Sequence, residues 1–402
     1  MRAKSVLLAS VVLGLAGLAG FEIGLRLQPG LLPEGAQLEL QWHALDQQTP
    51  TVAHPYTGFL YPPHFSGGMR HRDFGFSYTT DENGFRNPSP WPARADIVVI
   101  GDSQAFGYGV EFDQSWASRL AASLPNLRIV NLGLNAAAPQ QSLRTYELFG
   151  AALEPQLILF VLFPAHALNA VGRFDRWLEA GQPATYETWT TPAGLGAIPA
   201  AIRELLKSSH LYMAARHTVG SLVFGHWGQT IELDDGGRVQ LAPILNMDTY
   251  RHLDPDHPNF QLVLDTIDEI RQLGEGSGAE TLVLLIPTKE ELHLPRLGIP
   301  TASTTEPFAT AFESMGIPYV DVTPQFRERV SAGERLFFER DVHPNVDGYR
   351  LIADVLSDYL RTNASRFGWL SSGLHGEPQS AASVCSIMRI SSTPRSTPQP
   401  LP

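Results

Sequence analysis

The chain has 402 residues, 43% of them hydrophobic, which is enough for one large domain or two ordinary domains with a substantial core. Its formal net charge of −12, without a stripe of lysine or arginine, argues against general nucleic-acid binding. The one cysteine, Cys385, excludes an internal disulfide and a cysteine metal cluster. Histidine and aspartate residues are crowded over 252–257 without regular ligand spacing. A solvated loop is favoured there, and we expect neither a metal nor a cofactor.

The amino terminus has the features of an export signal. Arg2 and Lys4 precede an apolar run over residues 6–21, which residues 23–25 extend toward the ~20 residues that a spanning helix needs. No clean cleavage site and no lipobox cysteine is present. We therefore expect residues 1–27 to be kept as a signal anchor rather than removed as a signal peptide. The rest of the chain would then face the periplasm or the cell exterior.

The next part, residues 28–94, is rich in proline, glycine and aromatic residues and lacks helical periodicity, so we expect it to wrap the following domain. From residue 95, apolar strands alternate with helical patterns. The predicted strands are 95–100, 128–132, 157–163, 281–286 and 318–322, and the predicted helices include 141–153, 260–273 and 346–360. This alternation predicts an α/β domain over 95–367, with a parallel sheet covered by helices.

One long interruption and a tail stand apart from this pattern. The interruption, about 171–258, contains a helical stretch over 200–219 and a hairpin signal around 234–237. A long insertion beside a site is often a lid or a substrate-binding element, and a decorative insertion is the alternative. Residues 368–402 are rich in serine and proline without periodicity, which predicts disorder.

The most informative stretch surrounds Ser103. The apolar run from Ile97 to Ile100 predicts a strand buried on both faces, and Gly101 then lets the backbone turn sharply. A serine directly after such a strand lies where open α/β sheets place their ligands, so Ser103 is a candidate nucleophile. Taken alone, it fits a turn or helix-cap residue equally well.

A second pair of reactive residues precedes the last predicted helix. Asp341 and His343 are two positions apart and share a face of an extended segment, so the carboxylate can orient the imidazole. An oriented imidazole can remove the proton of a serine, whose hydroxyl is a weak nucleophile by itself. The alternative is a His-Pro turn that leads into the helix.

Three motifs in this order resemble those of the SGNH (GDSL-type) hydrolases: Gly101-Asp102-Ser103, Asn131-Leu132-Gly133 and Asp341-Val342-His343-Pro344. The resemblance implies a flavodoxin-like three-layer αβα sandwich that acts on acyl esters, often of sugars and lipids. By position, it makes Ser103 the nucleophile, His343 the base and Asp341 the residue that orients His343.

A weaker resemblance concerns the membrane-anchored branch of that superfamily, whose members are similar to envelope polysaccharide acetylation proteins. It is carried by the N-terminal anchor and by the segments Asn83-Gly84-Phe85-Arg86 and Leu285-Ile286-Pro287-Thr288-Lys289. This resemblance ranks a cell-envelope carbohydrate first among substrates.

The motifs for the oxyanion donors depart from the family. The resemblance places the N–H groups of Ser103 and Ala136 in the oxyanion hole, where the family usually has a glycine at the second position. His166, or Asn169 in a shifted alignment, stands where the family has a donating asparagine. A polar strand end without chemistry is the alternative for His166.

The resemblance therefore implies a serine esterase that forms an acyl-serine and deacetylates or acylates a cell-envelope carbohydrate. An O-acyltransferase uses the same residues, and its acyl group would come from a membrane acyl-donor protein. A catalytically silent glycan-binding or assembly protein is the alternative from another class, because a fold alone does not establish activity. The expected partners are an acylated carbohydrate or other acyl ester, and the membrane through the N-terminal helix.

Overall fold

The computed structural model describes residues 2–33, 36–37, 39–40, 51–71, 73–182, 184–189, 200–224, 230–232, 236–240, 256–298, 301–367 and 369–370. Of the tail predicted to be disordered, all but residues 369–370 lies outside these ranges, as does most of the loop 252–257.

Five parallel strands form the central sheet, and they follow the runs predicted from the sequence. They are β5 (Ile97–Gly101), β6 (Ile129–Asn131), β7 (Leu157–Leu162), β10 (Glu280–Leu285) and β11 (Tyr319–Asp321). Their spatial order is β11-β10-β7-β5-β6, which in chain order is the 2-1-3-4-5 arrangement of flavodoxin-like folds. Every residue of β5 and β7 is buried, as expected for parallel strands covered on both faces. The predicted fold class is confirmed.

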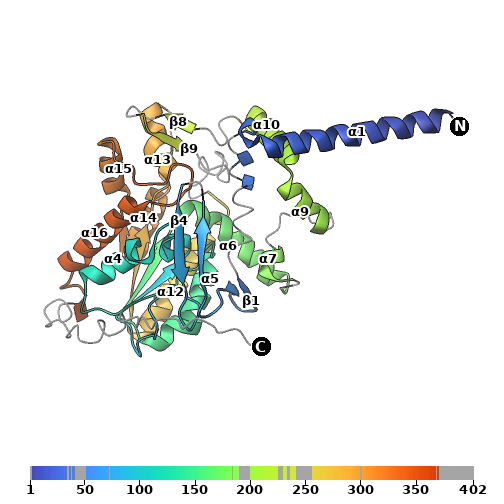
Figure 1. The fold of residues 1–402 in the computed structure, drawn as a ribbon. Coiled ribbons are helices and arrows are strands. Elements are labelled where there is room, and N and C mark those ends of the chain that lie inside the picture. The colour runs from blue at the N-terminus through green and yellow to red at the C-terminus, as the bar shows by residue number, and fades with distance from the viewer. Residues whose placement is uncertain are drawn as a thin grey trace, which may run out of the picture.

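Helices cover the two faces of this sheet (Figure 1). On one face α4 (Trp116–Ser123) packs against α16 (Val346–Thr362), beside α15 (Thr323–Ser331). The helices of the other layer contact one another in the same way: α5 (Pro139–Thr145), α6 (Pro164–Glu179), α12 (Phe260–Ser277) and α14 (Glu306–Met315). The predicted helix 141–153 changes type along its length, because residues 146–150 have π geometry and 151–153 have 3-10 geometry.

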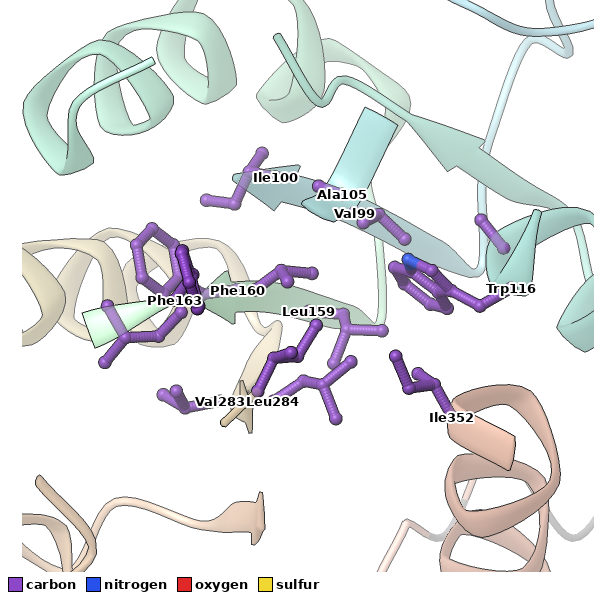
Figure 2. Packing of buried hydrophobic residues seen from close by; sticks show 14 of the residues in the cluster. Val99, Ile100, Ala105, Trp116, Leu159, Phe160, Phe163, Val283, Leu284 and Ile352 are labelled. Atoms are coloured by element: carbon purple, nitrogen blue, oxygen red, sulfur yellow. The ribbon is translucent and has the colours of Figure 1, made fainter. Parts of the chain in front are cut away.

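The core lies between the sheet and these helices. Figure 2 shows side chains of β5, β7 and β10 packed together, with Trp116 of α4 and Ile352 of α16 facing them. Both of these helix side chains are fully buried. The indole N–H of Trp116 donates to the carbonyl of Gln104, 2.8 Å away, so the core also bonds to the backbone next to Ser103.

The N-terminal part begins with α1 (Arg2–Leu27), which projects from the body of the molecule (Figure 1). Among the described residues, no helix combines the length and the apolar character that crossing a membrane requires. Two hairpins follow, β1 (Val52–His54) with β2 (Gly58–Leu60) and β3 (Ser66–Arg70) with β4 (Gly75–Thr79). Aromatic residues of the second hairpin join the main core, so this hairpin packs on the domain.

The interruption of the alternating pattern starts later than predicted. The predicted insertion 171–258 includes the second half of α6, which continues to Glu179 and packs on α12. Its described remainder consists of α7 (Tyr186–Trp189), α9 (Ala200–Ser208), α10 (His210–Phe224), and a hairpin of β8 (Thr230–Glu232) and β9 (Arg238–Gln240). The predicted helical stretch is thus two helices, and the predicted hairpin is present.

Candidate active site

Ser103 lies at the turn between β5 and a short helix, α3 (Ser103–Phe106). Gly101 ends the strand with a φ of +150°, and a Cβ there would lie 2.9 Å from the carbonyl oxygen of Val161. Asp102 caps the helix, because its side chain accepts a hydrogen bond from the N–H of Gln104. Glycine is needed for the close approach of β5 to β7, and the turn then presents Ser103 at the carboxyl edge of the sheet.

The structure brings Ser103, His343 and Asp341 together although 240 residues separate the serine from the histidine. His343 Nε2 lies 2.7 Å from Ser103 Oγ. His343 Nδ1 lies 2.5 Å from Asp341 Oδ1, which also accepts the backbone N–H of His343 at 2.9 Å. With the Nδ1 proton donated to the carboxylate, Nε2 is left to accept the serine proton, which is the arrangement of a Ser-His-Asp triad.

The electrostatics of the two aspartates differ. Burial alone would raise the pKa of the Asp341 carboxyl, but the charge and hydrogen bonds of His343, aided by His71, outweigh it and lower that pKa to about 2. Asp341 is therefore an ionised partner for the imidazole. Burial raises the pKa of Asp102, against the opposing effects of His166 and the Gln104 N–H.

The resemblance predicts two backbone donors for the oxyanion hole, the N–H groups of Ser103 and Ala136. Within the described part of the chain, the N–H groups of Ser103 and Ala136 donate no hydrogen bond. Ala136 is exposed in the turn after β6 and has a φ of +62°, a left-handed conformation that glycine adopts more readily. The alanine therefore holds, at a cost in strain, a backbone conformation that glycine adopts freely.

The side chains proposed as a third oxyanion donor are already engaged. His166 Nε2 lies 3.2 Å from the carbonyl oxygen of Ala137, and a neutral imidazole has one N–H to donate. The Asn169 amide donates to the carbonyl of Ala165, one turn back on its own helix. His166 thus lies next to the turn that carries Ala136, and Asn169 is exposed.

The motif Asn131-Leu132-Gly133 bonds to the short helix that begins with Ser103. The Asn131 amide donates to the carbonyl of Ala105 at 2.7 Å, and its oxygen accepts the N–H of Gly133 at 2.8 Å. A Cβ on Gly133 would lie 2.6 Å from the nitrogen of Phe106. Glycine is required here because the turn after β6 lies against the helix that begins with Ser103.

Several residues that contact the site carried no role in the sequence analysis. Arg86 is 3% exposed, and its guanidinium donates to the carbonyls of Gly107 and Val110 at 2.7 Å each. Asn87 exchanges two hydrogen bonds with the backbone of Asn131. Arg86 and Lys289 belong to segments that carried the weaker resemblance, which was the one available signal for them.

An aromatic ring lies against His343, and a cavity lies near the segment that precedes it. The ring of Tyr108 lies 4.7 Å from that of His343. A cavity of 380 Å³ lies beside the segment that leads to the triad, and its lining includes Arg340, Phe338 and Val239 of β9. The insertion therefore reaches the neighbourhood of the triad loop. No group of side chains suited to hold a metal ion occurs among the described residues.

Of the comparisons with known proteins, the one with solved structures gives matches. No protein-family model matches the sequence, and no curated protein matches it. Solved structures do: a putative lipolytic protein of the G-D-S-L family from Desulfitobacterium hafniense is 13% identical, covers 66% of this chain and 99% of its own, and has a TM-score of 0.35. The esterase EstA from a Pseudoalteromonas species is 12% identical, with 67% and 98% covered and a TM-score of 0.34.

A third similar structure is a catalytic mutant of an acetylxylan esterase from Geobacillus stearothermophilus, 12% identical, with 67% and 94% covered and a TM-score of 0.34. Because these TM-scores are low, the classification rests on the strand order and on the geometry around Ser103. By these criteria the chain has a flavodoxin-like fold with a Ser-His-Asp arrangement at the carboxyl edge of its sheet.

Proposed function

We propose that the protein is a serine esterase that cleaves acyl esters through an acyl-serine intermediate. The observation that carries the proposal is the continuous hydrogen-bonded series from Ser103 Oγ through the imidazole of His343 to the carboxylate of Asp341. A buried, ionised aspartate fixes the imidazole tautomer, and the imidazole in turn activates the serine.

The chemistry follows from these contacts. His343 Nε2 takes the Ser103 proton as the serine oxygen bonds to the acyl carbon. The N–H groups of Ser103 and Ala136 bind the oxygen that becomes negative. His343 then returns the proton to the departing alcohol oxygen, which leaves an acyl-serine. Water, activated by the same imidazole, releases the acid and regenerates the serine.

We further propose a cell-envelope carbohydrate ester as substrate and a location outside the cytoplasm, with membrane attachment through α1. The support is the sequence: Arg2 and Lys4 precede the apolar run, and side chains such as Leu13 and Leu27 of α1 are largely exposed. Fractionation of cells that express the full chain tests this proposal. Recovery of the full-length protein in the soluble cytoplasm would contradict it.

Acyl release from a simple acetyl ester by the full-length protein tests the catalytic proposal. A chain that starts at Gln28 is unsuitable, because Glu22 and Leu25 of α1 contact α10 or its hydrophobic neighbours. We expect turnover that Ser103→Ala abolishes and that Ser314→Ala, at an exposed serine on α14, leaves unchanged. Equal rates in the wild type and Ser103→Ala would reject a serine esterase.

Two alternatives share this fold. Transfer of the acyl group to a sugar hydroxyl uses the same residues, and analysis of products with and without a carbohydrate acceptor separates it from hydrolysis. A silent glycan-binding protein is favoured by one observation, the engagement of His166 and Asn169 with backbone carbonyls, which leaves two backbone donors for an oxyanion. Glycan binding without turnover and without acylation of Ser103 would support that alternative.

A further inference from the structure

Lys289 is a buried charge directly behind the triad loop. It is the first residue of α13 (Lys289–His293), which begins after β10, and its side chain is fully buried. Its ammonium donates to three successive backbone carbonyls, those of Glu339, Arg340 and Asp341, at 3.3, 3.0 and 2.8 Å. Burying an ammonium is costly unless its protons are bonded, and here all three are directed at one short stretch of chain.

Asp73 bonds to the same stretch of chain, but to its backbone N–H groups rather than to its carbonyls. It lies in the turn between β3 and β4, and its side chain is 4% exposed. Its Oδ2 accepts the backbone N–H groups of Arg340 and Asp341, at 2.6 and 2.9 Å, while Oδ1 accepts the guanidinium of Arg340 at 3.1 Å.

Together the two side chains fix both polar groups of the Asp341 backbone. The N–H of Asp341 points to the carboxylate of Asp73, and its C=O points to the ammonium of Lys289. The direction of the Asp341 side chain is thereby set, and that side chain holds His343 at 2.5 Å. Within the described part of the chain, neither Asp73 nor Lys289 bonds to the imidazole of His343 or to the hydroxyl of Ser103, so their effect on these groups passes through Asp341.

Burial of these two charges is weak evidence for a stabilising role. A buried ion pair is often no more stabilising than apolar residues of the same volume. Here two opposite charges, from segments far apart in the sequence, meet the one loop that carries the triad acid. The neighbouring His71 adds to this concentration of polar groups, since its Nδ1 lies 3.9 Å from Asp73.

We propose that Asp73 and Lys289 are positioning residues, which hold the backbone of Asp341 so that its carboxylate aligns His343 with Ser103. The inference rests on the proposed esterase function for its kinetic consequence. The hairpin of β3 and β4 then positions the triad loop through Asp73, and α13 positions the same loop through Lys289.

The test uses full-length Asp73→Asn and Lys289→Met, with Glu291→Gln as the control. Glu291 is buried on the same short helix and bonds to Thr288, the residue that caps this helix, and to Thr304 rather than to the triad loop. For both test variants we expect kcat to fall by about 10²-fold with KM unchanged, because small misplacements of catalytic groups have effects of this size. The control should lose stability without loss of kcat.

A second readout separates failure of this inference from failure of the esterase proposal. The proton between His343 Nδ1 and Asp341 gives its own NMR resonance, which exists whether or not the protein turns over an ester. We expect that resonance to shift or disappear in both test variants and to persist in Glu291→Gln. If the wild type has no turnover, the esterase proposal fails and the resonance still decides the positioning role.

Two results would overturn the inference: unchanged kcat in folded variants, or a resonance identical to that of the wild type. If Lys289→Met does not fold, Asp73→Asn decides alone, because asparagine keeps the shape of the side chain. A loss of melting temperature with full kcat at low temperature would make both residues purely structural.

Discussion

Two regions lie outside the alternating core, the N-terminal segment and the insertion. They differ in how directly they bond to the loops of the candidate active site. The N-terminal segment 51–94 bonds to the second and third site motifs and to the loop that follows the first. Arg86 binds the carbonyls of the loop after Ser103, Asn87 binds the backbone of Asn131, and Asp73 binds the segment that ends in Asp341.

The described parts of the insertion instead include a helix that bonds to α1. Glu22 of α1 accepts the backbone N–H groups of His210 and Leu211 at the start of α10, at 3.1 and 2.8 Å. Leu25 of α1 packs with Met213 of α10 in a small separate cluster. The insertion reaches the triad loop through β9, where Val239 lines the cavity.

This comparison between the two regions shows that a segment without helical periodicity can hold the loops of a site in place. The N-terminal segment contributes buried polar groups whose partners are backbone atoms of the site loops, and such bonds are costly to remove. The insertion, which resembles a lid by length and position, holds a helix that lies away from the triad. We therefore expect activity to depend on the segment more strongly than on the insertion.

The largest expected effect is that of Arg86→Met. The change leaves the carbonyls of Gly107 and Val110 without their donor in a buried place, which should lower the free energy of unfolding by about 3 kcal/mol. Chemical denaturation measures it. Arg216→Met, on α10 of the insertion, removes a half-exposed ion pair with Glu39 and should cost less than about 1 kcal/mol. Equal losses in the two variants would contradict the contrast between the regions.

A smaller effect is expected for Glu22→Gln, at the contact between α1 and the insertion. Burial acts to raise the pKa of Glu22, but the N–H of Leu211 and the guanidinium of Arg26 outweigh it and lower the pKa to about 2. Ionised Glu22 thus stabilises the contact above its ordinary pKa of 4.5, and this stabilisation is lost as the pH falls toward 2. We expect Glu22→Gln to destabilise α10 by about 1 kcal/mol at neutral pH, as for loss of a helix cap.

Hydrogen exchange of the α10 amides measures that effect, with the esterase rate as the internal control. The protection of α10 in the wild type should approach that of the variant as the pH falls to about 2, while kcat at neutral pH should be the same in both. A loss of kcat in Glu22→Gln would mean that the insertion does couple to the triad.

The sheet, Ser103 and the Asp341–His343 pair were predictable because their signals are local. A strand buried on both faces is a continuous apolar run, and two residues that share a face stand two positions apart in the sequence. Lys289 and Asp73 were not predictable in this way, since their partners are backbone groups 52 and 268 residues away. Backbone partners leave no trace in side-chain patterns. The weaker family resemblance marked Lys289 and Arg86 without a role.

The smallest expected effect concerns the turn that Asn87 and Asn131 hold, at Ala136. With a φ of +62°, alanine is strained there, whereas glycine adopts this conformation freely and gains entropy in the unfolded chain. These terms oppose each other, so Ala136→Gly should change the free energy of unfolding by less than about 1 kcal/mol, in the stabilising direction. Because the N–H of residue 136 keeps its place, kcat should stay within a factor of about two. A large loss of kcat with unchanged stability would contradict this expectation. It would mean that the methyl group of Ala136 contacts the substrate.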